Sequence, residues 1–349
     1  MRIFGQLAAP IYQEMAAKHS YRHLVQYSPE LPSKWKDELF RLASQFPVIH
    51  PVEVVDEDMQ DTVANEILSW GKSYRGTVVW FRVDDDDVLA RDYLDALEKY
   101  RNDNFAGMAI SFPRIYTALS VQDELGFFRV DDSPYNSLGQ AFVCRVDNNL
   151  GVFESPGMKP HHEIWRYLPT VVDATEAFAL WLRHPEQDSV YGGSTPGAKL
   201  ANLQAAMAKA PSANMPEVRT KFPTVAAKSI TLGKPVLETK TLRPGLRSTV
   251  ELGGAAEDQF FRVDYAIDFE AANHQGVVLC FSFEDDRGVE KQFPRDDKRG
   301  DYRRLYADEY GGGCIFFYLP AGSLLKSVVI QVDGAQSAVN EVNLTIRKA

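Results

Sequence analysis

Cysteine is scarce in this sequence, and the long apolar runs that span membranes are missing. The three cysteines, Cys144, Cys280 and Cys314, lie far apart among 349 residues. This spacing excludes a disulfide framework and a Cys-based zinc site, and it suits a reducing compartment. No run of about 18 apolar residues occurs, and Met1 to Gln6 lack the apolar core of a secretion signal. We therefore expect a cytoplasmic protein without a membrane span.

Positive charge is also in short supply in the first part of the chain. Residues 1–220 hold 30 Asp and Glu against 21 Lys and Arg, whereas residues 221–349 hold 18 against 17. An acidic surface opposes binding to a phosphate backbone, so nucleic acid is not expected as a partner. A Gly-x-Ser-x-Gly elbow is missing too, which leaves a hydrolase triad without support.

An acidic run follows the most strand-like segment of the chain. Thr77 to Phe81 is apolar, β-branched and aromatic, and the four aspartates Asp84 to Asp87 come shortly after it. Residues 88–100 carry apolar side chains at helical spacing. Adjacent carboxylates repel one another unless a cation neutralises them, and Mg²⁺ and Mn²⁺ take carboxylate and phosphate oxygens. Because ligands of open α/β sheets bind beyond the carboxyl ends of strands, a metal site is favoured over a solvated acidic turn.

Strand-like and helix-like segments alternate through residues 1–215. The pattern predicts an α/β domain with a mixed, mostly parallel sheet and helices on both faces. Predicted strands are 23–27, part of 46–55, 77–81, 108–112, 126–130, 140–146, 170–173 and 178–183, and predicted helices are 1–20, a segment starting at Ser33, 58–70, 88–100 and 197–210.

The character of the chain changes after a linker predicted at residues 211–216. Residues 222–349 contain short strands of period two separated by Gly, Asp and Asn turns, which predicts a second domain, an antiparallel β-sandwich. This domain either binds glycan through Tyr302, Tyr306 and Tyr310 or serves as a packing or homo-oligomerisation module. The second role is slightly favoured, since β-sandwiches host many unrelated functions.

The acidic run also carries a family resemblance. Arg-Val-Asp-Asp-Asp-Asp-Val-Leu, residues 82–89, resembles the Asp-x-Asp region of nucleotide-sugar glycosyltransferases with the GT-A fold. It is most similar to the bacterial family described as putative rhamnosyltransferases, over about residues 20–195. The resemblance implies a GT-A-like domain that uses Mn²⁺ or Mg²⁺. It further implies an inverting transfer of a hexosyl or deoxyhexosyl group from a nucleoside-diphosphate sugar to a surface or extracellular polysaccharide.

Roles for the residues of the run follow from this resemblance. Asp84 and Asp86 alternate and are the predicted metal ligands. Asp85, Asp87 and Arg82 are then left to bind the donor. Two alternatives stay open, in which Asp85 and Asp87 have structural roles or Arg82 is a charge partner that holds the carboxylates apart.

Three later residues complete the predicted site. Glu163, in His161-His162-Glu163, occupies the place where inverting members of the superfamily carry an acidic residue, so it is the predicted general base, with His162 second. The alternative is that Glu163 offsets a helix dipole. His184 resembles the late His of the family and is a predicted metal or diphosphate ligand, the alternative being a hydrogen-bonded strand end.

An alternative function also stays open. Family members usually have a further strand before this region, whereas only about twenty residues precede His23 here, and they predict a helix. The alternative is a non-catalytic carbohydrate-binding or structural protein on a degenerate glycosyltransferase scaffold.

Overall fold

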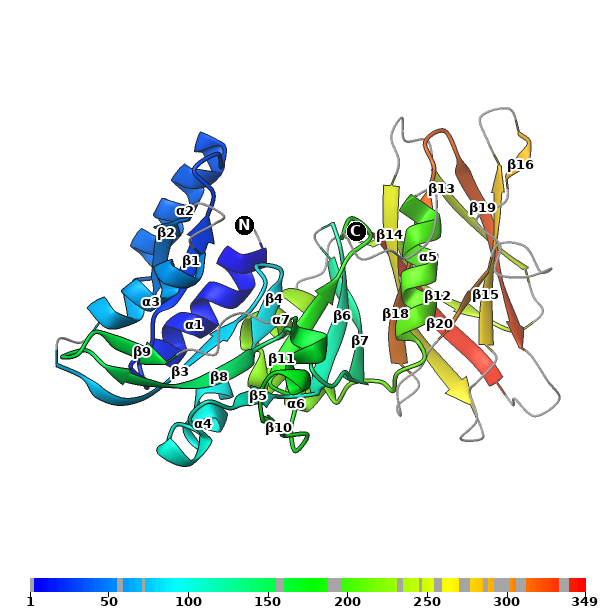
Figure 1. Cartoon of the computed structure of the whole chain (residues 1–349). Helices are drawn as coiled ribbons and strands as arrows, with labels where there is room; N and C mark the ends of the chain where they lie inside the picture. The colour runs from blue at the N-terminus through cyan, green and yellow to red at the C-terminus, as the bar shows by residue number, and fades with distance from the viewer. Residues whose placement is uncertain are drawn as a thin grey trace. The chain divides into compact units, whose positions relative to one another are not determined.

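The structure, a computed structural model, divides into two units by the contacts among its residues. Unit 1 comprises Met1–Tyr116, Val130–Leu182 and Asn214–Ala227, and unit 2 comprises Thr117–Arg129, Arg183–Ala213 and Lys228–Ala349. Most helices and strands of both units are labelled in Figure 1. The residues that the structure describes are 3–54, 59–70, 73–122, 124–154, 160–187, 196–230, 235–244, 247–253, 259–269, 277–284, 288–291, 302–305, 312–332 and 339–349.

Unit 1 begins with helix, as the sequence predicts. A π-helical turn, η1 (Phe4–Ala8), leads into α1 (Ala9–Ala16), which buries Ile11, Tyr12 and Met15. Phe4 is therefore helical and does not belong to an additional strand.

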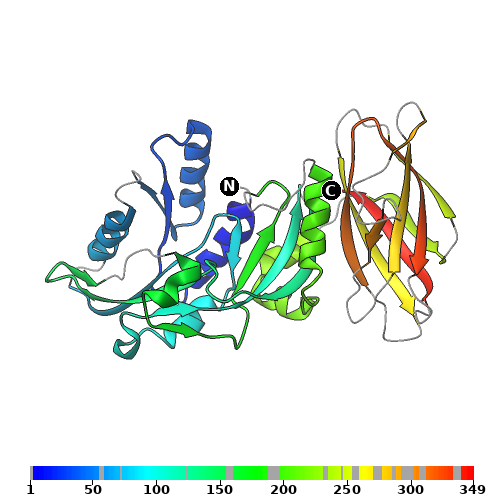
Figure 2. The same cartoon turned by 45° about the vertical axis from the view of Figure 1, so that its right-hand side comes forward.

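The next four elements form a small α/β layer in unit 1. β1 (His23–Tyr27) and β2 (Ile49–Glu53) pair in parallel, with His23 opposite Ile49. α2 (Ser33–Gln45) and α3 (Met59–Ser69) lie beside this pair (Figure 2). α2 buries Leu39 and Leu42, which are three residues apart and so share one helical face.

The main sheet of unit 1 has the strand order β10-β5-β8-β3, with β9 paired to β8. Two 3₁₀ helices, η3 (Asp103–Phe105) and η4 (His161–Arg166), belong to the connections between its strands. Ile164 of η4 packs with buried Ala109, Phe142 and Cys144 of the sheet. The strands are β3 (Arg75–Arg82), β5 (Ala109–Ser111), β8 (Gln140–Asp147), β9 (Val152–Glu154) and β10 (Thr170–Val172).

The predicted mostly parallel sheet is wrong for the described strands of unit 1. β1–β2 and β5–β10 are parallel, whereas β3–β8, β5–β8 and β8–β9 are antiparallel. The physical reason is β8, which pairs antiparallel to both of its neighbours in the centre of the sheet. The coarser prediction, a mixed α/β architecture, is confirmed.

A further antiparallel pair follows the acidic run. β4 (Asp87–Leu89) pairs with β11 (Ala179–Arg183), and Leu89 lies opposite Ala179. The helix predicted over residues 88–100 is confined to α4 (Tyr93–Glu98). The prediction is wrong for residues 88 and 89, because the apolar Val88 and Leu89 are buried as strand residues.

Unit 2 contains two antiparallel sheets that share one hydrophobic core. Their strand orders are β12-β20-β14-β18 and β13-β19-β15-β16, with β17 paired to β15. This pairing agrees with the antiparallel strands predicted for this part of the chain. The strands are β12 (Pro235–Leu242), β13 (Arg247–Gly253), β14 (Gln259–Phe269), β15 (Val277–Glu284), β16 (Glu290–Lys291), β17 (Tyr302–Arg304), β18 (Gly312–Leu319), β19 (Leu324–Val332) and β20 (Val339–Lys348).

Earlier parts of the chain contribute to the same core. α5 (Pro196–Met207) lies along β18 (Figure 1), and the Gln204 side chain donates to the Phe316 carbonyl at 2.7 Å and accepts its N–H at 2.8 Å. β6 (Arg114–Val121) and β7 (Glu124–Asp132) are neighbours that contribute residues to both units. Leu119, Val121 and Phe127 from this pair are buried in the core of unit 2.

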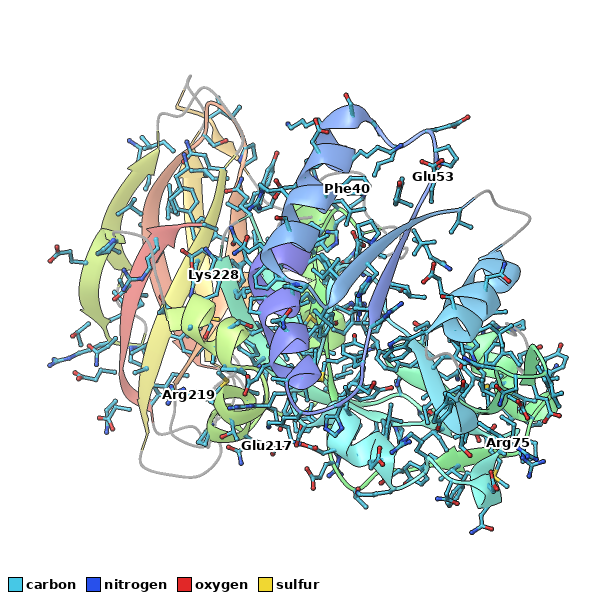
Figure 3. The ribbon with its side chains drawn as sticks, turned by 90° about the vertical axis from the view of Figure 1, so that its left-hand side faces the viewer. Phe40, Glu53, Arg75, Glu217, Arg219 and Lys228 are labelled. Atoms are coloured by element: carbon cyan, nitrogen blue, oxygen red, sulfur yellow. The ribbon has the colours of Figure 1, made fainter. Side chains whose placement is uncertain are left out.

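The domain boundary therefore differs from the predicted division at residues 215–222. Asn214 caps α6 (Met215–Lys221), which carries Glu217 and Arg219 (Figure 3), and α7 (Pro223–Ile230) follows at once. The buried Lys221 amine donates to Asp92 at 2.7 Å and to Glu176 at 2.8 Å, both in unit 1. Only the last two residues of the predicted linker, Met215 and Pro216, are helical, and the helix that they begin is tied to unit 1.

None of the helices in the described part of the chain is both long enough and apolar enough to cross a lipid bilayer. Cys144 and Cys314 are buried free thiols. Tyr306 and Tyr310 lie outside the described residues and Tyr302 belongs to β17, so their predicted glycan contact stays a prediction.

Candidate functional site

The acidic run forms a tight turn between two strands. β3 ends at Arg82, β4 begins at Asp87, and the Asp87 N–H donates to the Asp84 carbonyl at 3.2 Å. Asp84 and Asp85 are exposed, Asp86 is half-buried and Asp87 is buried. The four carboxylates of this one turn therefore differ in their exposure to solvent.

A cavity of about 1320 Å³ in unit 1 borders this turn. All five residues of β1 line it, and so do Thr77 to Arg82 of β3. Asp84 and Asp85 lie among its lining residues, together with Trp70, which follows α3. The cavity therefore has aromatic and apolar walls and a pair of carboxylates where β3 ends.

Partial desolvation raises the pKa of the Asp84 carboxyl, and the neighbouring Asp86 and Asp85 charges raise it further. Arg82 and His161 oppose this rise. A positive ion placed beside Asp84 would favour its charged form in the same way. The repulsion that Asp84 experiences is therefore only partly balanced by Arg82 and His161.

Asp87 differs from the other three aspartates. It is only 3% exposed, and one of its carboxylate oxygens, Oδ1, lacks a hydrogen-bond partner among the described residues. Burial, followed by the Asp86 and Asp84 charges, raises its pKa well above the usual range, while the Leu182 N–H opposes the rise. A buried carboxyl in β4 corresponds to the structural alternative for Asp87, and its donor-binding role stays a prediction.

Arg82 connects the acidic turn to η4. Its guanidinium Nη2 lies 2.8 Å from Nδ1 of His161, and the Gln140 side chain donates to the His161 carbonyl at 3.3 Å. Burial lowers the pKa of His161, and the Arg82 and His162 charges lower it further. A neutral His161 accepts the hydrogen bond from Arg82, so the start of η4 is fixed beside the end of β3.

The predicted base belongs to this same short helix. Glu163 Oε1 lies 3.0 Å from Arg166 Nη1, and the Glu163 side chain is 32% exposed. His162 is exposed, and its ring meets that of His161 edge-on at 5.2 Å. The structure thus brings the segment of Glu163 and His162 to Arg82, while the catalytic roles of both residues stay predictions.

His184 is assigned to unit 2, whereas the acidic turn and η4 belong to unit 1. It follows β11 in a turn in which its N–H donates to the Gln187 side chain at 3.2 Å. Its role as a metal or diphosphate ligand stays a prediction. Among the described residues, no group of three or more His, Cys, Asp or Glu side chains is placed to hold a metal.

Sequence reasoning missed the aromatic wall of the cavity. The Tyr21 hydroxyl lies 2.6 Å from His23 Nδ1, the His23 ring stacks on Tyr12 at 4.6 Å, and Tyr21 stacks on Phe81 at 5.8 Å. Burial lowers the pKa of His23 to about 4. The sequence did not indicate this wall, because the stacked rings come from separate segments of the chain. The aromatic residues around His23 were the available signal.

Comparisons with curated proteins and with solved structures give no strong match. No curated protein matches the chain. Among solved structures, the C-terminal domain of EclA, described as a sugar-binding protein, is 13% identical over 34% of this chain and 83% of its own, with a TM-score of 0.20. A CocE/NonD family hydrolase from Staphylococcus aureus is 9% identical over 33% of this chain and 31% of its own, with a TM-score of 0.17. Neither similarity is strong enough to support an argument.

The family match covers more than half of the chain. The family described as "Putative rhamnosyl transferase" matches residues 14–194, a range that includes β1, β3, the acidic turn and η4. The chain therefore belongs to the putative rhamnosyl transferase family.

Proposed function

We propose that this protein is a metal-dependent, inverting glycosyltransferase. It would transfer a hexosyl or deoxyhexosyl group from a nucleoside-diphosphate sugar to a surface or extracellular polysaccharide. The observation that supports this function most directly is the cavity of about 1320 Å³ bordered by Arg82, Asp84 and Asp85, in the region that the family match covers.

The cavity suits a donor of this size and chemistry. Ligand sites usually measure about 300–1,000 Å³ and combine apolar walls with a few polar groups, so the volume of about 1320 Å³ is ample for a nucleotide sugar. Tyr21, Trp70 and Phe81 supply aromatic surface for a base. The carboxylates and Arg82 are the proposed ligands of the diphosphate and its counterion.

The carboxylate oxygens of the turn are suitable ligands for a hard divalent cation. Mg²⁺ is usually held by one or two carboxylates plus substrate phosphates and water, so a large protein cage is not needed. Asp84 is the first expected ligand, with Asp86 as predicted from the sequence or Asp85, which lines the cavity, as the second. When bound, the ion neutralises charge on the leaving diphosphate. Arg82 adds a fixed positive charge at the same place.

Glu163 is the proposed general base and His162 its alternative. Inversion requires the base and the leaving group on opposite sides of the anomeric carbon. The proposal is supported by the position of η4, which the Arg82–His161 hydrogen bond holds beside the end of β3. Arg166 orients the Glu163 carboxylate at 3.0 Å. Glu163→Gln is expected to lower turnover by about 10²–10⁴ with donor affinity retained.

Calorimetric titration of nucleoside-diphosphate sugars in the presence of Mn²⁺ tests the donor site. We expect Asp84→Asn to weaken Mn²⁺-dependent binding at least tenfold, and the same titration of Asp85→Asn and Asp86→Asn identifies the second ligand. Asp37→Asn, an exposed aspartate of α2, is the matched control and should bind as the parent does. A parent protein that binds none of these donors, with or without Mn²⁺, would favour the non-catalytic alternative.

A further inference from the structure

The outer surface of η4 and the residue after it expose large aromatic side chains. Trp165 is 53% exposed and Tyr167 is 51% exposed, whereas Ile164, directly before Trp165, is completely buried. One apolar anchor therefore holds the short helix to the sheet. The aromatic groups on its outside contribute nothing comparable to the core, and exposed apolar surface of this kind often marks an interaction site.

A charged pair, Glu163 and Arg166, belongs to the same helix as the indole. The Arg166 guanidinium lies over the Trp165 ring, 5.2 Å from its centroid, and pairs with Glu163 at 3.0 Å. Each contact is weak at a partly exposed site, and together they favour this position of Arg166. η4 thus presents an indole, a guanidinium and a carboxylate as one ordered set.

This combination matches the two kinds of surface on a sugar ring. A pyranose has an apolar C–H face, which packs on an aromatic ring, and a rim of hydroxyls, which hydrogen-bond to charged planar groups. A lipid chain would use the apolar surface but not the carboxylate–guanidinium pair beside it. We propose that Glu163, Trp165 and Arg166 form a binding site for a pyranose unit of a glycan.

The place of η4 indicates which glycan this is. His161, four residues before Trp165, is hydrogen-bonded to Arg82, and Arg82 lines the donor cavity. No residue of η4 lines the cavity itself, so a sugar bound on η4 lies outside the donor cavity and is connected to it through the His161–Arg82 contact. We therefore assign this sugar to the acceptor. This assignment rests on the proposed function, whereas the binding of the sugar itself requires neither donor nor metal.

Saturation-transfer NMR with methyl glycosides of glucose, galactose, mannose, N-acetylglucosamine and rhamnose tests the site. At least one glycoside should bind the parent protein, and Trp165→Ala should weaken its binding about tenfold. Trp165→Phe should retain part of the affinity, because it keeps a ring. Trp35→Ala is the matched control: Trp35 is 43% exposed on α2 and also has a cation over its ring, Lys34 at 5.0 Å.

The outcomes separate this inference from the proposed function. Equal losses in Trp165→Ala and Trp35→Ala, or no binding of any of the five glycosides by the parent, overturn the inference. Asp84→Asn should bind the glycoside as the parent does. If donor binding fails while the Trp165-dependent binding remains, the glycosyltransferase proposal fails and the sugar site stands.

Discussion

His23 links the wall of the cavity to the stability of unit 1. Its pKa is about 4 in the folded protein and about 6.5 in an unfolded chain. Above pH 6.5 the ring is neutral in both states. As the pH falls from about 6.5 to about 4, only the unfolded state takes up the proton, so stability falls through this window and then levels off.

Urea denaturation between pH 7.5 and 4.5 measures this effect. We expect His23 to account for a loss on the order of 2 kcal/mol, allowing for the partial exposure of its ring. His23→Phe keeps a ring against Tyr12 but does not titrate, so its stability should depend less on pH than that of the parent. An unchanged pH dependence in this variant would show that His23 is not responsible.

The contribution of Asp87 to stability depends on pH in the opposite direction to that of His23. Its folded-state pKa is raised by burial, so the carboxyl favours folding at low pH and costs stability as the pH rises above the value of the unfolded chain. Asp87→Asn should therefore match the parent near pH 4 and exceed it at pH 7.5 by about 1–3 kcal/mol. Urea denaturation at both values checks this, with Asp37→Asn as the unaffected control. Destabilisation of Asp87→Asn at pH 7.5 would mean that the carboxylate is paired there.

The location of the candidate site could be predicted from the sequence, but the environment of its residues could not. Asp84 to Asp87 could be located from their position after an apolar strand, and the structure does place them at its end. Their different burial could not be predicted, because it depends on β11, more than 90 residues away. The same holds for Arg82 and His161, whose contact joins residues 79 apart in the chain.

Among the elements, strands were easier to locate than to pair. Most predicted segments of period two or of continuous apolar character are strands in the structure, since these patterns report local burial. β6 was missed even though nearly all of its residues are buried. Which strands run parallel depends on contacts across the sheet, and local pattern carries no information about these.

The β6–β7 pair provides a test of packing within unit 2. A Cβ at Gly126 would lie 2.4 Å from Sγ of Cys314 and 3.4 Å from the Phe316 ring. Gly126→Ala should therefore destabilise the protein by about 1–3 kcal/mol through overpacking. Urea denaturation measures the loss.

A double-mutant cycle with Cys314→Ala tests the cause. The single Cys314→Ala variant loses the hydrogen bond from the Phe127 N–H, 3.0 Å long, but it also makes room beside Gly126. The double variant should be more stable than the sum of the two single effects predicts. Strict additivity would indicate that the two positions are not in contact.

For the whole molecule, the existence of two parts was predictable, while their composition was not. The change from mixed to strand-only pattern near residue 222 reflects local sequence. The inclusion of residues 117–129 and 183–213 in unit 2 depends on long-range packing, such as that of Leu119, Phe127 and Leu203 in its core.

A fragment ending at residue 215 tests this composition. It retains Leu119, Val121, Phe127, Leu200 and Leu203, all buried in the core of unit 2, but lacks the two sheets that complete that core. We expect the fragment to aggregate and to bind a hydrophobic dye, as measured by size-exclusion chromatography and fluorescence, with the full chain as control. A monomeric fragment with a cooperative thermal transition would instead support a domain boundary at residue 215.

The interleaving of the two units also has a genetic consequence. Each unit draws on three stretches of the chain, and β6, β7 and β11 contain residues of both. A single recombination event that replaced only the C-terminal sheets would leave the β6–β7 hairpin and α5 in place. These elements would then have lost the sheets against which they pack. A relative that carries a different C-terminal module is expected to have replaced residues 117–129 and 183–213 together with it, so that these three stretches are inherited as one block.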